Sequence, residues 1–512
     1  MGMEICGDDQ HPSVSISSSS SSSSAAPTTE VMKRTLKRGE SPEGELRTCA
    51  GGPSARWVIH NGLSNEDTEL HLIRLHAIEQ QAHVRDGNVW TALAHIITAV
   101  IGSGVLSLAW SMSQLGWIAG PLTMLAFASV TLTSALLLRH CYKYSSDPDY
   151  GPARNGSYIE AVGNILGKRN GWVCGIIVRI NFIKLGIVYT IASSISMSAI
   201  QRSNCYHTEG HKAACKYGNV RYMLTFGIIQ TIASQIPDFQ NTIWLSVIAA
   251  IMSFTYSIIG SALGLAEVIK NGLIKGSIGG VPTTTAAEKV WAISEALGNI
   301  AFAFPFSVIF LEIQDTLKST PPEKVTMKRA SIMAVCITTS FCLCCGGFGY
   351  AAFGNSTPGN LLTGFGFYEP YWLVNFANAC VALHPVGGYQ VFSQPLFANV
   401  EKWISKKFPN SKFVHKNYAL KQVPVLRLNL LRLCFRTSYV AFTTGLAILF
   451  PYFNQVLGVA GAINFWPVVV YFPVEMYLEQ KNIRRWTWQV YRSSNLCFCY
   501  VASDNVCICW LS

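Results

Sequence analysis

The stretch Ala-His-Ile-Ile-Thr-Ala-Val-Ile-Gly-Ser-Gly-Val-Leu-Ser-Leu, residues 94 to 108, decides the fold. It belongs to an apolar segment long enough to cross a bilayer, because about 20 predominantly apolar residues span the hydrocarbon core as a helix. Yet Gly102 and Gly104 fall in its middle, where a regular helix would prefer larger residues. The stretch therefore predicts a membrane helix that is interrupted near the bilayer midplane.

A second interruption occurs five apolar segments later, in Gly-Asn-Ile-Ala-Phe-Ala-Phe-Pro-Phe-Ser, residues 298 to 307. Pro305 removes one helix hydrogen bond and clashes with the preceding turn. Each break alone is explained as well by glycine packing or a simple proline kink. Their matched positions in two halves of the chain instead favour an inverted-repeat transporter. We therefore predict an all-α polytopic membrane protein with a five-plus-five inverted-repeat fold, in which helices 1 and 6 are discontinuous.

The composition of the whole chain agrees with a membrane protein. Half of the 512 residues are apolar and only 13% are charged. About ten apolar segments are long enough for transmembrane helices, because each must satisfy its own backbone hydrogen bonds in lipid. They lie near Trp90–Gln114, Trp117–Leu138, Trp172–Ile200, Tyr222–Ile236, Thr242–Ala266, Trp291–Ile313, Ala330–Phe353, Trp372–Ala398, Leu430–Phe450 and Val456–Tyr477.

The polar regions complete the predicted domain organisation. Residues 1–85 are polar, include a serine tract from Ser17 to Ser24, and are expected to form a disordered cytoplasmic tail. Residues 86–482 form the transmembrane transporter domain. Residues 483–512 are an atypical C-terminal segment, too polar and too short for a regular eleventh helix.

The basic residues indicate the orientation. The net charge of +11 could suggest nucleic-acid binding, but the Lys and Arg residues lie between apolar segments and form no basic face with interleaved aromatics. Most of them fall in the connections that face inward if the N-terminus is cytoplasmic. The positive-inside rule therefore predicts a cytoplasmic N-terminus.

The two interruptions define a predicted substrate site. Unwinding a helix exposes backbone N–H groups and brings the partial positive charge of a half-helix N-terminus to the midplane, which suits a carboxylate. Freed carbonyl groups can accept hydrogen bonds from an ammonium group. The predicted substrate-binding residues are Ile101, Gly102, Ser103, Gly104, Val105, Ala303, Phe304, Pro305 and Ser307.

Ionisable residues inside apolar segments are candidates for proton coupling, because they are costly there. His95 lies two helical turns before Gly102, and His384 lies in the eighth segment. Either imidazole titrates near physiological pH, although a neutral histidine bonded between helices explains each one equally well. Lys184 is predicted deep in the third segment, and Asp315 at the inward end of the sixth.

Two outward-facing features concern modification. Cys205 and Cys215 flank a short polar loop on the predicted outer side, where thiols oxidise, so a disulfide is expected. Asn355 begins an Asn-Ser-Thr sequon near the predicted membrane surface and is a possible glycosylation site. The spacing of the other cysteines does not match a zinc site, and no cofactor is expected.

Several motifs of this chain resemble those of the plant amino acid permeases, of the amino acid/auxin permease family. The resemblance covers roughly residues 85 to 485 and rests on several long, ordered motifs. They are Val89-Trp90-Thr91-Ala92, residues 94–110, Gln114-Leu115-Gly116-Trp117, Gln235-Ile236-Pro237-Asp238-Phe239, residues 251–257, residues 311–318 and residues 471–477.

The resemblance implies an eleven-helix transporter at the plasma membrane that imports neutral and often acidic amino acids by proton symport. Some positions depart from the family pattern. Asn299 stands where an Asp is common, which removes a carboxylate with a potential role in coupling; Asn299 therefore joins His95 and His384 as a coupling candidate. Lys184 replaces a small residue, Gln240 an acidic one and Asn464 a glycine.

The sequence therefore favours a secondary active transporter whose partners are an amino acid, protons and the lipid bilayer, with no nucleic acid. Asn299, Lys184 and the polar C-terminal segment motivate an alternative from another class, a non-transporting amino acid receptor or inactive paralogue. An auxin or other organic-anion carrier is a related alternative. An enzyme is disfavoured, because the segments contain no nucleophile–base pair, metal-ligand cluster or phosphate loop.

Overall fold

The computed structural model describes residues 85–144, 153–210, 212–215, 217–235, 243–365, 370–420, 423–482, 498–502 and 506–510. All of these belong to one unit, Ile73–Ser512. The predicted N-terminal tail, apart from Arg85, lies outside the described residues. So do Gln240 and the first part of the predicted C-terminal segment.

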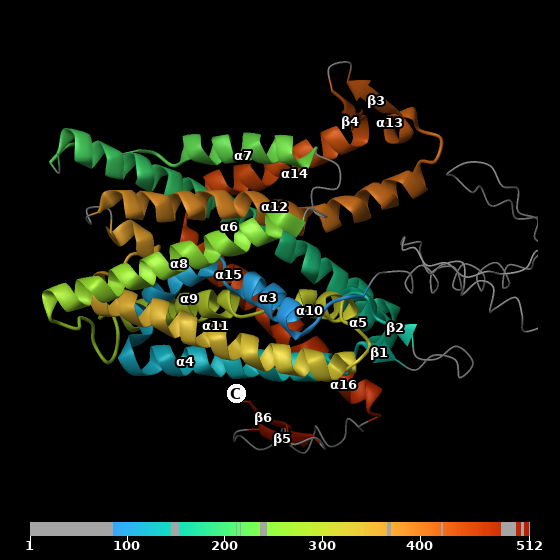
Figure 1. Cartoon of the computed structure of the whole chain (residues 1–512), viewed down its shortest axis with the longest axis horizontal. Coiled ribbons are helices and arrows are strands. Elements are labelled where there is room, and N and C mark those ends of the chain that lie inside the picture. The colour runs from blue at the N-terminus through green and yellow to red at the C-terminus, as the bar shows by residue number, and fades with distance from the viewer. Residues whose placement is uncertain are drawn as a thin grey trace, which may run out of the picture. The chain divides into compact units, whose positions relative to one another are not determined.

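Helices account for most of the described chain, and each predicted apolar segment coincides with one or more of them (Figure 1). The helices are α3 Val89–Val100, η1 Ser103–Ser107, α4 Leu108–Leu138, α5 Tyr158–Leu166, α6 Lys168–Glu209, α7 Val220–Ser234, α8 Ile243–Asn271, α9 Ala286–Ala303, α10 Ser307–Asp315, α11 Glu323–Phe353, η3 Gly354–Ser356, η4 Leu361–Phe365, α12 Tyr371–Lys407, α13 Lys412–His415, α14 Leu430–Leu449, α15 Phe453–Asn464, the π-helix η5 Phe465–Tyr471 and α16 Phe472–Gln480.

Three short antiparallel hairpins occur in the described residues. They are β1 Lys143–Tyr144 with β2 Ala153–Arg154, β3 Asn417–Leu420 with β4 Val423–Asn429, and β5 Phe498–Ala502 with β6 Val506–Trp510. The last hairpin lies within residues 483–512, the segment predicted to be too polar and too short for a regular eleventh helix.

Six helical stretches of the described chain are long and apolar enough to cross a membrane. They are Gly104–Leu138, Lys168–Glu209, Ile248–Asn271, Ala286–Asp315, Glu323–Ser356 and Phe453–Gln480. Large apolar side chains are also exposed on the helix surfaces, among them Ile228, Trp291 and Trp372. An apolar exterior of this kind is what lipid contact requires.

Local sequence explains where the first helices begin and turn. Asn88 caps α3, because its side-chain oxygen accepts hydrogen bonds from the backbone N–H groups of Trp90 and Thr91 at 2.9 and 3.1 Å. The first two predicted segments meet at Gly116, whose φ of 84° is the left-handed region that favours glycine. A β-carbon there would also overlap the backbone of Ile278.

The packing of the bundle places α9 and α15 at its centre. In Figure 1, α7 and α14 lie along one edge of the bundle and α4 along the other, with α3, α9, α10 and α15 drawn between them. Helix α15 packs against both α6 and α9, while α9 also packs against α4 and η1. The elements that carry the predicted site are therefore surrounded by other helices.

Candidate functional site

The first interruption falls where the sequence predicts it. The last helical hydrogen bond of α3 runs from the Ile101 N–H to the Ile97 carbonyl at 2.8 Å. Ile101 and Gly102 then adopt extended conformations before η1 begins at Ser103. Ile101, Gly104 and Val105 are buried, and Gly102 is half-buried. The backbone thus leaves the helix inside the bundle.

The second interruption separates α9 from α10. Helix α9 ends at Ala303, and Phe306 lies outside the helical region with φ −127° and ψ 11°. Pro305 lies between them and has no N–H to donate. Ala303, Phe304 and Ser307 are buried, whereas Pro305 is half-buried.

The fold brings the two interruptions together. A β-carbon at Gly104 would lie 3.0 Å from Phe302 Cδ1 and 3.5 Å from Ala303 Cα. The hydroxyl oxygens of Ser134 on α4 and Ser307 on α10 lie 3.3 Å apart. The chain near Gly104 therefore passes directly against the end of α9, and glycine permits this close approach.

His384 is the one predicted coupling histidine that lies beside an interruption. A β-carbon at Gly102 would lie 3.9 Å from His384 Nε2. On the other side of the ring, Nδ1 is 3.0 Å from both Ser253 Oγ and the Ala249 carbonyl oxygen. Because a carbonyl only accepts hydrogen bonds, the Nδ1–H tautomer fits this position, leaving the lone pair of Nε2 towards Gly102.

His95 and Asn299 occupy different environments. The His95 side chain is exposed on α3, so the structure does not bring it to the junction of the two interruptions. Asn299 is fully buried on α9, and neither its Oδ1 nor its Nδ2 has a hydrogen-bond partner. A buried amide without partners is costly.

Asn299 follows Gly298 on α9, where this helix meets α15. Gly298, Gly458 and Gly461 allow the two backbones to meet, because a β-carbon at Gly298 would overlap the Gly458 carbonyl and one at Gly461 would overlap the Gly298 carbonyl. Glu295 Oε1 and both polar side-chain atoms of Asn299 are buried here without hydrogen-bond partners. We call this contact the α9–α15 seam, and it consists of Glu295, Gly298, Asn299, Gly458 and Gly461.

Glu295 is a further candidate that the sequence motifs do not single out. It lies inside a predicted apolar segment, one helical turn before Asn299, and its Oε1 is buried without a hydrogen-bond partner. Its signal in the sequence is a carboxylate within an apolar segment. Lys184, by contrast, was predicted deep in its helix; its Nζ donates to the Ala460 carbonyl of α15 at 2.9 Å.

A second group of charged residues lies around the end of α10 and the start of α11, and its acidic residues, Asp315 and Glu323, are both paired. We call it the α10–α11 cluster: Arg85, Tyr142, Lys143, Arg154, Asp315 and Glu323. Glu323 accepts from Arg85 at 2.7 Å and from Lys143 at 2.9 Å. Asp315 accepts from the Tyr142 hydroxyl at 2.6 Å and lies 4.0 Å from Arg154. Burial, together with the hydrogen bond to Asp315, raises the pKa of Tyr142.

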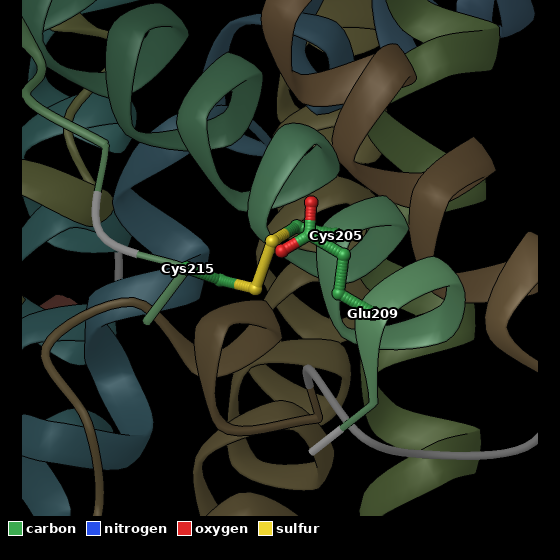
Figure 2. A group of neighbouring side chains, drawn as sticks. All are labelled: Cys205, Glu209 and Cys215. Atoms are coloured by element: carbon green, nitrogen blue, oxygen red, sulfur yellow. A yellow bond between two sulfur atoms is a disulfide. The ribbon is translucent and has the colours of Figure 1, made fainter. Parts of the chain in front are cut away.

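Cys205 and Cys215 are joined by a disulfide between the end of α6 and the following loop, with Glu209 beside it (Figure 2). These three residues are close enough to suggest a metal site. Metal binding, however, needs thiolates, and both sulfur atoms are already in the disulfide. Asn355 is exposed in η3, within 3.5 Å of the Tyr350 hydroxyl.

Comparison with known proteins identifies the family. The model of the family described as transmembrane amino acid transporter protein matches residues 85–510. Probable amino acid permease 7 from Arabidopsis thaliana is 58% identical over 433 residues, covering 82% of this chain and 92% of that protein. Amino acid permease 3 is 53% identical over 410 residues, covering 79% and 85%.

A more distant relative, lysine histidine transporter-like 6 from the same plant, is 31% identical over 419 residues, covering 79% of this chain and 86% of that protein. The matches run through both interruptions and most of the helical bundle. The chain therefore belongs to the transmembrane amino acid transporter family, among the plant amino acid permeases, and is a multi-pass membrane protein rather than an enzyme.

Proposed function

We propose that this protein is a secondary active transporter that imports amino acids, neutral and also acidic, by proton symport with alternating access. The observation that carries the proposal is the contact between the two interrupted helices, where Gly104 packs against Phe302 and Ala303. Transporters with paired discontinuous helices bind substrate at such a contact. The names of the relatives support amino acids as the substrate class.

The backbone at the two interruptions would bind the parts that all amino acids share. The N–H groups that follow the first interruption suit the carboxylate, and the carbonyls at the end of α9 suit the ammonium group. Side chains then select by volume. The residues assigned to this site are Ile101, Gly102, Ser103, Gly104, Val105, Ala303, Phe304, Pro305 and Ser307.

The proposed topology has about ten transmembrane helices in two inverted repeats of five, with the N-terminus in the cytoplasm and the protein in the plasma membrane. The six apolar helical stretches and the exposed apolar side chains support this arrangement. In this orientation the Cys205–Cys215 disulfide and the Asn355 sequon face outward, where oxidation and glycosylation take place.

Proton coupling is assigned to residues close to the site. His384 is the strongest of the predicted candidates, because its Nε2 faces Gly102 while Nδ1 is held by Ser253 and Ala249. Asn299 cannot itself carry a proton at ordinary pH, and the exposed position of His95 gives it no direct contact with the site.

A non-transporting amino acid receptor or inactive paralogue is the second candidate. It is favoured by Asn299, which lacks a carboxylate, and by Lys184, whose ammonium group is bonded to the backbone of α15. An auxin or other organic-anion carrier would use the same architecture with a different substrate. Saturable surface binding without uptake would identify the receptor.

The test is uptake of labelled L-alanine and L-glutamate into transport-deficient cells that display the protein on their surface. The assay is done at acidic and neutral external pH, with and without a protonophore, and with indole-3-acetate as a competitor. We expect uptake that rises at acidic pH and falls with the protonophore. Binding without uptake would contradict transport, whereas uptake independent of pH would contradict only the coupling to protons.

A further inference from the structure

The α9–α15 seam contains a carboxylate for which the proposed site has no role. Glu295 lies in an apolar helical stretch, nine residues after Ala286 and four before Asn299. Residues four apart lie on the same helix face. Glu295 is half-buried, and its Oε1 is fully buried without a hydrogen-bond partner. Ionisable residues at such depth mark ion or proton paths more often than they stabilise a fold.

Glu295 is accompanied by buried polar side chains that lack hydrogen-bond partners. Asn299 is fully buried with both of its polar side-chain atoms unpaired, and the side-chain oxygens of Asn454 and Asn464 on α15 are also buried and unpaired. Such unpaired groups are unusual, because buried polar groups are normally paired. A protonated carboxylic acid at Glu295 supplies a donor of the kind that the Asn299 oxygen lacks, one turn away on the same helix face.

The position of the carboxylate is fixed by the glycines of the seam. A β-carbon at Gly458 would lie 3.4 Å from Glu295 Cγ and 3.1 Å from the Glu295 carbonyl oxygen. The absence of a side chain at Gly458 therefore leaves room for the Glu295 side chain against α15. The seam is thus built around this residue as well as around the Gly298 contact.

Few charged residues lie near Glu295 that would disfavour a proton on its carboxylate. The elements packed against α9 are α4, η1 and α15, and none of them contains an Asp, Glu, His, Lys, Arg, Cys or Tyr residue. On α9 itself, Lys289 donates to the carbonyls of Gln114, Gly279 and Val281 at 2.9, 3.0 and 2.8 Å. Glu288 accepts from Thr284 at 2.7 Å. On the α6 side of α15, Lys184 is bonded to Ala460.

We propose that Glu295, rather than His384 or another candidate predicted from the sequence, is the proton-binding residue of the transporter and that it acts one turn from Asn299. The proposal rests on the proposed function and its orientation, in which α9 begins at the outer side. A proton from the outer solution adds to the carboxylate and forms the neutral acid, which is compatible with the seam. After the site opens inward, the O–H bond breaks, the proton leaves to the cytoplasm, and the carboxylate is restored.

The test uses the full-length protein in cells and labelled L-alanine as the probe. The ratio of uptake at external pH 5.5 to uptake at pH 7.5 measures coupling, and exchange of internal for external alanine at equal pH measures the substrate site. In Glu295→Gln we expect the pH ratio to fall close to one while exchange is retained. Glu295→Asp is expected to keep the pH ratio. Glu288→Gln, on the exposed first turn of the same helix, is the matched control and should behave as the wild type.

The outcomes separate this proposal from the proposed function. If wild-type uptake does not depend on pH, proton symport itself is wrong. If uptake depends on pH in both the wild type and Glu295→Gln, and exchange is retained, Glu295 is not the proton-binding residue. If Glu295→Gln reaches the surface but loses both activities, the double variant Glu295→Gln with Asn299→Asp decides. Recovery of pH-dependent uptake would support a carboxylate role in the seam, and failure to recover would contradict it.

Discussion

Buried polar groups lack partners in the α9–α15 seam, whereas they are paired in the α10–α11 cluster. In the cluster, Glu323 is 3% exposed and has two cationic partners, and Asp315 has a hydroxyl donor and a nearby guanidinium group. In the seam, Glu295 lies against Gly458, and both Glu295 and Asn299 have buried polar atoms without partners. Glu295, Asn299 and Asp315 all lie on the same interrupted stretch, Ala286–Asp315, and Glu323 begins the next helix.

This difference indicates a stabilising role for the cluster and a functional role for the seam. A buried carboxylate with cationic partners is held in one charge state, because losing either partner would leave a buried charge uncompensated. A carboxylate without such partners can change its charge at lower cost to its neighbours. The cluster therefore ties the chain before α3 to α10 and α11, whereas the seam is suited to taking up and releasing a proton.

The largest effect is expected from filling the seam, in Gly461→Ala. The new β-carbon would overlap the Gly298 carbonyl and lie 2.7 Å from the Phe302 nitrogen. Both are backbone atoms, so they cannot rotate away, and overpacking of this kind costs about 3 kcal/mol. We expect little folded protein, measured by size-exclusion chromatography of the fluorescently tagged protein in detergent. Gly445→Ala on α14 is the control, since nothing lies within 4 Å of its β-carbon position; equal loss in both variants would contradict the close contact.

The second-largest effect is expected from a substitution in the α10–α11 cluster. Glu323→Gln leaves Arg85 and Lys143 without their shared carboxylate. Charged hydrogen bonds of this kind contribute about 1.5–3 kcal/mol, so the midpoint of thermal unfolding should fall clearly. Glu267→Gln on α8 is the control, because its carboxylate bonds within its own helix to Asn271 at 2.7 Å. An unchanged midpoint for Glu323→Gln would mean that the cluster does not stabilise the protein.

Much of the fold could be predicted from the sequence, because lipid imposes a simple rule on segment length and polarity. The two interruptions were also predictable, since Gly102, Gly104 and Pro305 each disfavour a regular helix for a known reason. The structure places both breaks where these residues lie. Whether the two halves form an inverted repeat is still a prediction.

The seam could not be predicted in the same way. Gly298, Gly458 and Gly461 are unremarkable in the sequence, and their importance arises only when α9 and α15 cross. The pairing state of Glu295 likewise depends on residues more than 150 positions away along the chain. For His95 the sequence distance from Gly102 predicts a shared face, whereas the exposure of its side chain on α3 depends on how the helices pack.

A smaller effect is expected from Tyr142→Phe, which removes one hydrogen bond to Asp315 and so costs about 1 kcal/mol. Burial and this bond raise the pKa of Tyr142 above its usual 10.0. The phenol therefore keeps its proton more strongly in the folded state than in the unfolded state. Its contribution is fully present below pH 10 and is lost as the pH rises above it. The difference in unfolding midpoint from the wild type should shrink at high pH. Tyr452→Phe, at an exposed position, should show no such difference.

The smallest change in stability is expected from Asn299→Leu, although the residue is fully buried. Both amide atoms lack partners, so replacing them with an apolar group of similar size removes a cost rather than a bond. The free energy of unfolding should stay within about 1 kcal/mol of the wild type, or rise. The pH-dependent uptake of L-alanine should fall, because the seam loses a polar group. A loss of stability as large as that of Glu323→Gln would show that the amide is paired in the working protein. The seam would then stabilise the fold as the cluster does, and the contrast between the two regions would disappear.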